Sequence, residues 1–117
     1  MADLTARLRA AATDRGDAAL ALLRGMIAAQ RTGEAAVQAE VARGLAGAGA
    51  EVHSLRYRPA EVPMREEFAA EPPPGERESV LGLLSGTGGG RSLILFAHPD
   101  SEPLPAAPGW SVDPFTG

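Results

Sequence analysis

A sequence of 117 residues, 44% of them hydrophobic, is long enough for one globular core and too short for two domains of ordinary size. With a formal net charge of −4 and no basic cluster, it offers nucleic acid no electrostatic surface. It contains no cysteine, and its basic residues are all arginine, which excludes thiolate chemistry, disulfides and a phosphate-loop or Schiff-base lysine within this sequence.

No stretch reaches the roughly 18 consecutive apolar residues that a membrane span requires. The N-terminus also lacks the basic and apolar regions of a secretion signal. We therefore expect residues 1–117 to form a single domain, or part of one, in the cytoplasm and without a membrane partner.

The first half of the sequence predicts three helices, over residues 3–16, 17–30 and 32–49. Apolar residues repeat at helical spacing in each of them. Asp17 can cap the second, which is either a separate helix or a continuation of the first, and Thr32 can cap the third. We expect the third helix to end at Gly47 and Gly49, because glycine adopts the left-handed conformation that closes helices.

The second half predicts strands and loops. Residues 51–58 have a β-compatible pattern, and residues 59–78 are rich in Pro and Glu, which is typical of an exposed loop. Two apolar runs, 79–85 and 92–97, are separated by a glycine-rich turn. The second run has no polar alternation and predicts a strand buried on both faces. The expected fold is therefore α/β, with N-terminal helices packed on a mixed sheet whose central strand is 92–97.

His98 and Asp100 follow this predicted central strand directly. Ligands of open α/β sheets bind beyond the carboxyl ends of the strands. An imidazole nitrogen can bind a divalent metal, and a nearby carboxylate can hold the ring and raise its basicity. The alternative is that Asp100 caps a turn and His98 is an ordinary strand-end residue.

The surrounding sequence favours the metal interpretation. SLILFAHPDSEP, from Ser92 to Pro103, is followed by GWSVDPFTG at the C-terminal end. This block resembles the zinc-dependent exopeptidase and deacylase family of acetylornithine deacetylase, succinyl-diaminopimelate desuccinylase, aminoacylase-1 and carboxypeptidase G. In that family an apolar strand precedes His-x-Asp, and a Trp and an Asp-Pro-Phe follow. Ser101 and Glu102 stand where the family commonly has two apolar residues, and the earlier helix and strands resemble it less specifically.

The resemblance implies a hydrolase of amide bonds that acts on small peptides or N-acyl amino acids. Its cofactor would be a pair of divalent metals, zinc or else cobalt or manganese, with His98 as a metal ligand and Asp100 as the support of that ligand. The complete enzyme would be a homodimer. The family's other ligands and its glutamate base would lie beyond Gly117. We therefore expect an incomplete catalytic domain, inactive alone, whose remainder is supplied by the same or another chain.

Other polar and aromatic residues have simpler interpretations. His53 is expected to be a surface residue, Glu102 a solvated loop carboxylate, and Asp113 a residue that fixes a turn. Trp110 and Phe115 are expected to pack their loop onto the sheet rather than wall a cleft. The competing function is a non-catalytic interaction module that uses the same α/β scaffold without metal.

Overall fold

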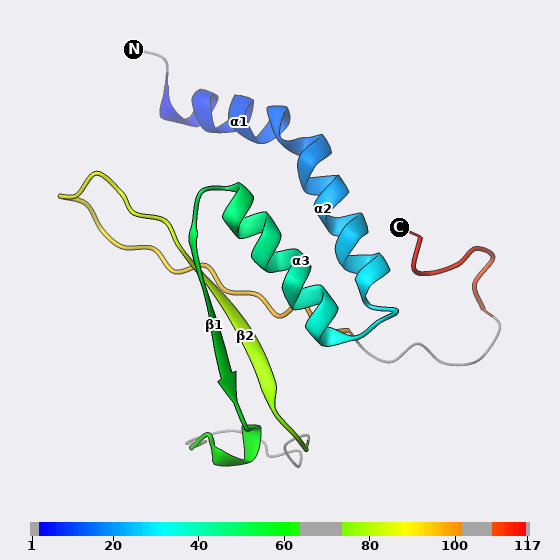
Figure 1. Ribbon diagram of the computed structural model, residues 1–117. Helices are drawn as coiled ribbons and strands as arrows, with labels where there is room; N and C mark the ends of the chain where they lie inside the picture. Colours follow the sequence, from blue (N-terminus) through cyan, green and yellow to red (C-terminus); the bar gives the residue numbers. More distant parts are fainter. Residues whose placement is uncertain (1–2, 64–73, 102–108, 117) are drawn as a thin grey trace. The chain divides into compact units, whose positions relative to one another are not determined.

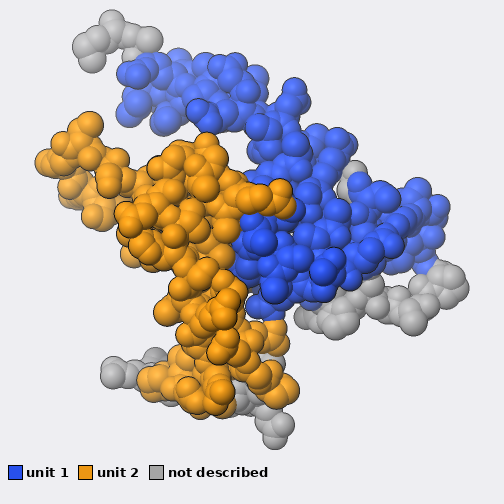
Figure 2. All heavy atoms as spheres, viewed as in Figure 1, with its two compact units in different colours: residues 1–40, 99–117 blue, residues 41–98 orange. Residues whose placement is uncertain are grey.

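The computed structural model describes residues 3–63, 74–101 and 109–116, and its elements confirm the α/β class. In chain order they are α1 (Leu4–Asp14), α2 (Gly16–Ala29), α3 (Glu34–Gly47), β1 (Glu51–Tyr57), a short 3-10 helix η1 (Pro59–Glu61) and β2 (Arg77–Leu83) (Figure 1). Two compact units are present, 1–40 with 99–117, and 41–98 (Figure 2). Within the described ranges, no helix is both long and apolar enough to cross a bilayer.

The first helices begin close to the predicted positions. Asp3 caps α1, because its Oδ1 accepts a hydrogen bond from the Thr5 N–H at 3.2 Å. The predicted cap at Asp17 is wrong. Arg15 is the N-cap of α2 and makes no side-chain capping bond. Asp17 lies instead in the first turn, where its negative charge faces the positive end of the helix dipole.

Helix α3 begins one residue later than a Thr32 cap would require. The carbonyl of Gly33 accepts the first bonds of the helix, from Ala36 N–H at 3.1 Å and Val37 N–H at 3.3 Å. Gly33 has φ of 122°, a conformation that residues with a Cβ rarely adopt, so glycine takes the position before the helix. The helix also carries the described residues with least exposure, Val37 at 0% and Gln38 at 8%.

The end of α3 confirms the predicted glycine stop. Gly49 has φ of 85°, and its N–H donates to Ala46 O at 2.9 Å. The Ala50 N–H donates to Leu45 O at 3.0 Å. These two bonds are the 5→2 and 6→1 pair of a Schellman motif, which satisfies carbonyls that the helix end would otherwise leave without partners.

Strands β1 and β2 pair antiparallel, with Val52 opposite Gly82 and Ser54 opposite Val80. Because side chains alternate across a strand, these residues share one face of the sheet. Leu45 of α3 packs on this face, since a Cβ built at Gly82 would lie only 2.9 Å from Leu45 Cδ2. Glycine at position 82 therefore lets the helix approach the sheet.

The opposite face of the sheet carries Leu55, Leu81 and Leu83, which are exposed by 64%, 52% and 49%. His53 lies on the same face, opposite Leu81 in the register. This sheet has apolar residues on both faces, and in unit 2 the second face is open to solvent.

Two sequence predictions about the sheet are wrong. The sheet is antiparallel rather than mixed, and residues 92–97 form no strand. The run Leu93, Ile94, Leu95 and Phe96 is 80% to 95% exposed instead of buried. The physical reason is that β2 pairs with β1 rather than with this run. Among the described residues the run therefore has no ladder partner, which a buried strand requires.

The segments around these strands agree with the predictions only in part. Gly88 and Gly89 have φ of 87° and 75°, so the glycine-rich segment does bend the chain, but it does not join a hairpin. In the predicted loop 59–78, the first residues form η1 and the last two belong to β2. Residues 64–73 of that loop lie outside the described residues.

Candidate functional site

His98, Pro99 and Asp100 lie in a segment without regular secondary structure, and His98 and Asp100 are exposed. The peptide between them contacts α2. Gln30, the C-cap residue of that helix, donates a hydrogen bond from Nε2 to the Pro99 carbonyl oxygen at 2.8 Å, in a partly buried position. The backbone between the two predicted site residues is thus held from the end of a helix.

The second half of the motif forms a turn around Asp113. Its Oδ1 accepts a hydrogen bond from the Phe115 N–H at 3.0 Å. Its carbonyl oxygen accepts bonds from the Thr116 N–H at 3.1 Å and the Thr116 Oγ1 at 2.8 Å. A side chain that bonds the backbone two residues on is the Asx-turn that aspartate favours before proline. The prediction that Asp113 fixes a turn is confirmed.

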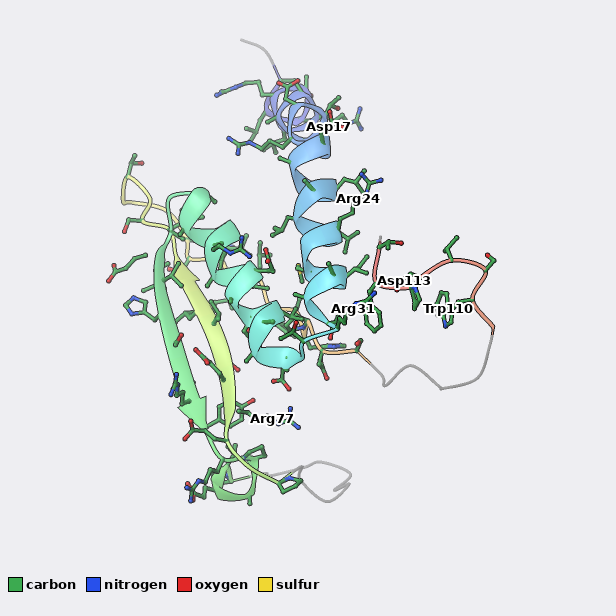
Figure 3. All side chains as sticks on the ribbon, turned by 45° about the vertical axis from the view of Figure 1, so that its right-hand side comes forward. Asp17, Arg24, Arg31, Arg77, Trp110 and Asp113 are labelled. Atoms are coloured by element: carbon green, nitrogen blue, oxygen red, sulfur yellow. The ribbon has the colours of Figure 1, made fainter. Side chains whose placement is uncertain are left out.

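Arg31 joins this turn to the end of α2. Its Nη2 forms an ion pair with the Asp113 carboxylate, and its guanidinium lies 5.0 Å from the centre of the Phe115 ring. Figure 3 shows Arg31 and Asp113 side by side, with Trp110 on the same C-terminal segment. The hydrogen bond from the Phe115 N–H, and then the Arg31 guanidinium, lower the pKa of Asp113 below its ordinary value, with desolvation opposing them.

The two residues of the predicted metal site have side chains of the types that bind divalent metals, but two residues are too few to form a site. His98 offers an imidazole nitrogen and Asp100 a carboxylate, both ordinary zinc ligands or supports of ligands. Zinc sites take three or four protein ligands. Nowhere in the described ranges do three or more His, Asp or Glu side chains gather in a way that could hold a metal. Any complete site therefore needs ligands in addition to these two residues.

The remaining candidates agree with the sequence interpretations only in part. His53 is a partly exposed residue of β1, with Nε2 3.2 Å from Glu51 Oε1. Trp110 is 59% exposed, so its expected packing is wrong, and Phe115 is partly buried beneath Arg31. Glu102 lies outside the described residues.

Sequence reasoning missed Gln30 and Arg31. Gln30 was expected only as the end of a helix, and Arg31 was given no role. Their partners lie 69 and 82 residues further along the chain, a separation that local pattern reading does not detect. A glutamine and an arginine at a helix end are also ordinary surface residues, so their types give no signal.

Comparisons of this chain with protein-family models, with curated proteins and with solved structures find no match. A functional assignment therefore depends on the residues and their contacts.

Proposed function

We propose that this chain is the N-terminal part of a metal-dependent hydrolase of amide bonds, an exopeptidase, a dipeptidase or a deacylase of N-acyl amino acids. The observation that supports the proposal is the motif block, defined as residues 98–100 together with residues 110–115. Its residue types and spacing resemble the zinc-dependent exopeptidase and deacylase family. The contacts of Pro99 and Asp113 with the end of α2 are consistent with a block that acts as a unit.

In this proposal His98 binds a metal through a neutral imidazole nitrogen, and Asp100 holds that imidazole in the required tautomer. The cofactor would be a pair of zinc, cobalt or manganese ions. When bound, such ions polarise the scissile carbonyl and lower the pKa of a bound water. The other ligands and the general base would come from further sequence in the same or another chain. The complete enzyme would be a cytoplasmic homodimer.

The experiment that tests the proposal compares His98→Ala and Asp100→Asn in the assembled protein, meaning this chain together with whatever carries the remaining ligands. His98→Ala removes a metal ligand, so turnover of N-acyl amino acids or dipeptides should fall close to background. Asp100→Asn removes only a support of that ligand, so metal affinity or turnover should fall about 10- to 100-fold. Metal content by elemental analysis, measured beside the rate, separates the two roles.

His53→Ala is the control, because His53 is the other histidine of the chain and lies exposed on β1. It should leave metal content and rate unchanged. Full metal and normal turnover in His98→Ala, with both lost in His53→Ala, would show that the assignment is wrong. The chain of 117 residues alone should show no turnover even with added zinc or cobalt, and robust activity of the pure chain would also contradict the proposal.

One observation favours a second candidate function, a non-catalytic interaction module. Residues Leu93 to Phe96 form an apolar run that is at least 80% exposed. Such a run can add as a strand to a sheet edge of another polypeptide, with no metal involved. The two candidate functions predict different results for His98→Ala. An interaction module would still bind its partner, and it would lose no metal-dependent activity.

A further inference from the structure

Two neighbouring residues at the C-terminal end of α2 contact both parts of the motif block. Gln30 donates to the Pro99 carbonyl at 2.8 Å, and Arg31 pairs with the Asp113 carboxylate and stacks on Phe115. All five residues belong to the same compact unit. One helix end therefore holds two segments that are separated in the sequence.

The backbone that carries these two side chains is itself fixed. The Gln30 N–H donates to Met26 O at 3.2 Å, and the Arg31 N–H donates to Ala28 O at 3.3 Å. The helix is continued in this way for one turn beyond its last residue. The backbone from which both side chains extend is therefore held by hydrogen bonds.

The hydrogen bond from Gln30 acts on the ψ torsion of Pro99, which the sequence leaves free. Proline fixes its own φ, and a following proline restricts His98 to extended conformations. The ψ angle of Pro99 is not restricted in this way. The Pro99 carbonyl and the Asp100 N–H share one planar peptide. A bond to that carbonyl therefore sets the direction in which the chain enters Asp100.

Arg31 acts on the second segment through charge and ring contact together. Its side chain and that of Asp113 are 60% and 43% exposed, and an exposed ion pair contributes little to folding stability. The guanidinium also stacks on the Phe115 ring, and this second contact further restricts the orientation of the arginine side chain. These contacts can therefore orient the turn while contributing little to folding stability.

We propose that Gln30 and Arg31 are positioning residues of the motif block, with Gln30 acting through Asp100 and Arg31 through the Asp113 turn. The catalytic part of this inference rests on the proposed function, in which His98 binds a metal and Asp100 supports that ligand. The structural part does not, and it can be tested on the chain of 117 residues alone.

The structural test measures backbone order at Asp100 by ¹⁵N relaxation. Gln30→Glu keeps the size of the side chain but replaces the N–H donor with an acceptor, which repels the Pro99 carbonyl. The order parameter of the Asp100 amide should fall from a rigid value of about 0.85 to below about 0.6. Gln30→Lys keeps N–H donors and should restore part of the order. Unchanged order at Asp100 in Gln30→Glu would overturn the proposal.

The matching test for Arg31 uses Trp110, the only tryptophan of the sequence. Arg31→Ala should free the turn and lower the fluorescence anisotropy of Trp110. Arg24→Ala is the control, because Arg24 carries the same side chain about two turns earlier on α2. Arg31→Lys keeps a cation beside Asp113 and leaves the bond from the Phe115 N–H in place, so it should recover part of the anisotropy. Equal effects of Arg24→Ala and Arg31→Ala would contradict a specific role for Arg31.

The functional test is a double-mutant cycle in the assembled protein. Gln30→Ala should lower metal affinity or turnover about tenfold, at the low end of the range typical of residues that support a ligand. If it acts through Asp100, it should cause no further loss in an Asp100→Ala background. Additive losses would exclude that route. A protein that keeps its metal and rate in His98→Ala would sink the proposed function, while the relaxation data would still decide whether Gln30 holds the peptide.

Discussion

At the scale of single residues, Asp113 is the described group with a lowered pKa. A carboxylate with a lowered pKa contributes stability above the pKa of the unfolded chain, about 3.9 for aspartate, and loses it as the pH falls through the lower folded value. The Asp113 turn should therefore be intact at neutral pH and should loosen only below about pH 4. The anisotropy of Trp110, followed from pH 7 downward, should fall in that acidic window.

Asp113→Asn provides the control for this titration. Asparagine still accepts the Phe115 N–H but has no charge for Arg31, while every other carboxylate of the chain remains. Subtracting its pH curve from that of the native chain isolates Asp113 from general acid unfolding. Identical curves for the two proteins would show that Asp113 does not control the turn.

Asp113, whose role was predicted from the sequence, has its partner close in the chain. It bonds Phe115, two residues away. The turn preference of aspartate before proline expresses such a short-range bond directly. Gln30 and Arg31 have their partners across the fold, and neither residue type demands a particular partner. No local rule could have found them.

At the scale of elements, the end of α3 gives a stability prediction. Gly49→Ala places a Cβ at φ of 85°, which should cost about 1 kcal/mol or somewhat more. For a small domain this lowers the melting temperature by roughly 4–8 °C, measured by circular dichroism. Gly47→Ala is the matched control, because it lies within α3 and a Cβ there meets nothing within 4 Å. It should be neutral or stabilising, since alanine is the better helix former. A larger loss in Gly47→Ala than in Gly49→Ala would contradict the Schellman end.

The elements that were predicted correctly are those whose signals are local. Helical spacing and a closing glycine identified α3, and a β-compatible pattern identified β1. The prediction of a strand at residues 92–97 was wrong. An apolar pattern indicates that a segment favours burial, but it does not identify the strand with which the segment would pair. The glycine-rich segment before it suggested a hairpin with residues 79–85, whereas β2 pairs with β1 across the long connection from residue 58 to residue 76.

At the scale of the whole molecule, apolar surface is the dominant feature of unit 2. The open sheet face has three exposed leucines, and the run 93–96 adds four large apolar side chains. Among the described residues the sheet has two strands, and each has an edge that no other described strand pairs with. Unpaired edges and contiguous apolar patches of this kind favour association with another polypeptide.

The chain alone should therefore self-associate through the run 93–96, in a concentration-dependent way that sedimentation velocity can measure. Burying a Phe or Leu side chain contributes about 1.5–3 kcal/mol. Leu95→Arg combined with Phe96→Asp should accordingly weaken association by at least about tenfold, the factor that 1.4 kcal/mol represents. Leu4→Glu is the control, because Leu4 is a 64% exposed leucine on α1, outside the run. Should Leu4→Glu disrupt association as strongly, or should the native chain stay monomeric at high concentration, the run 93–96 is not the associating surface.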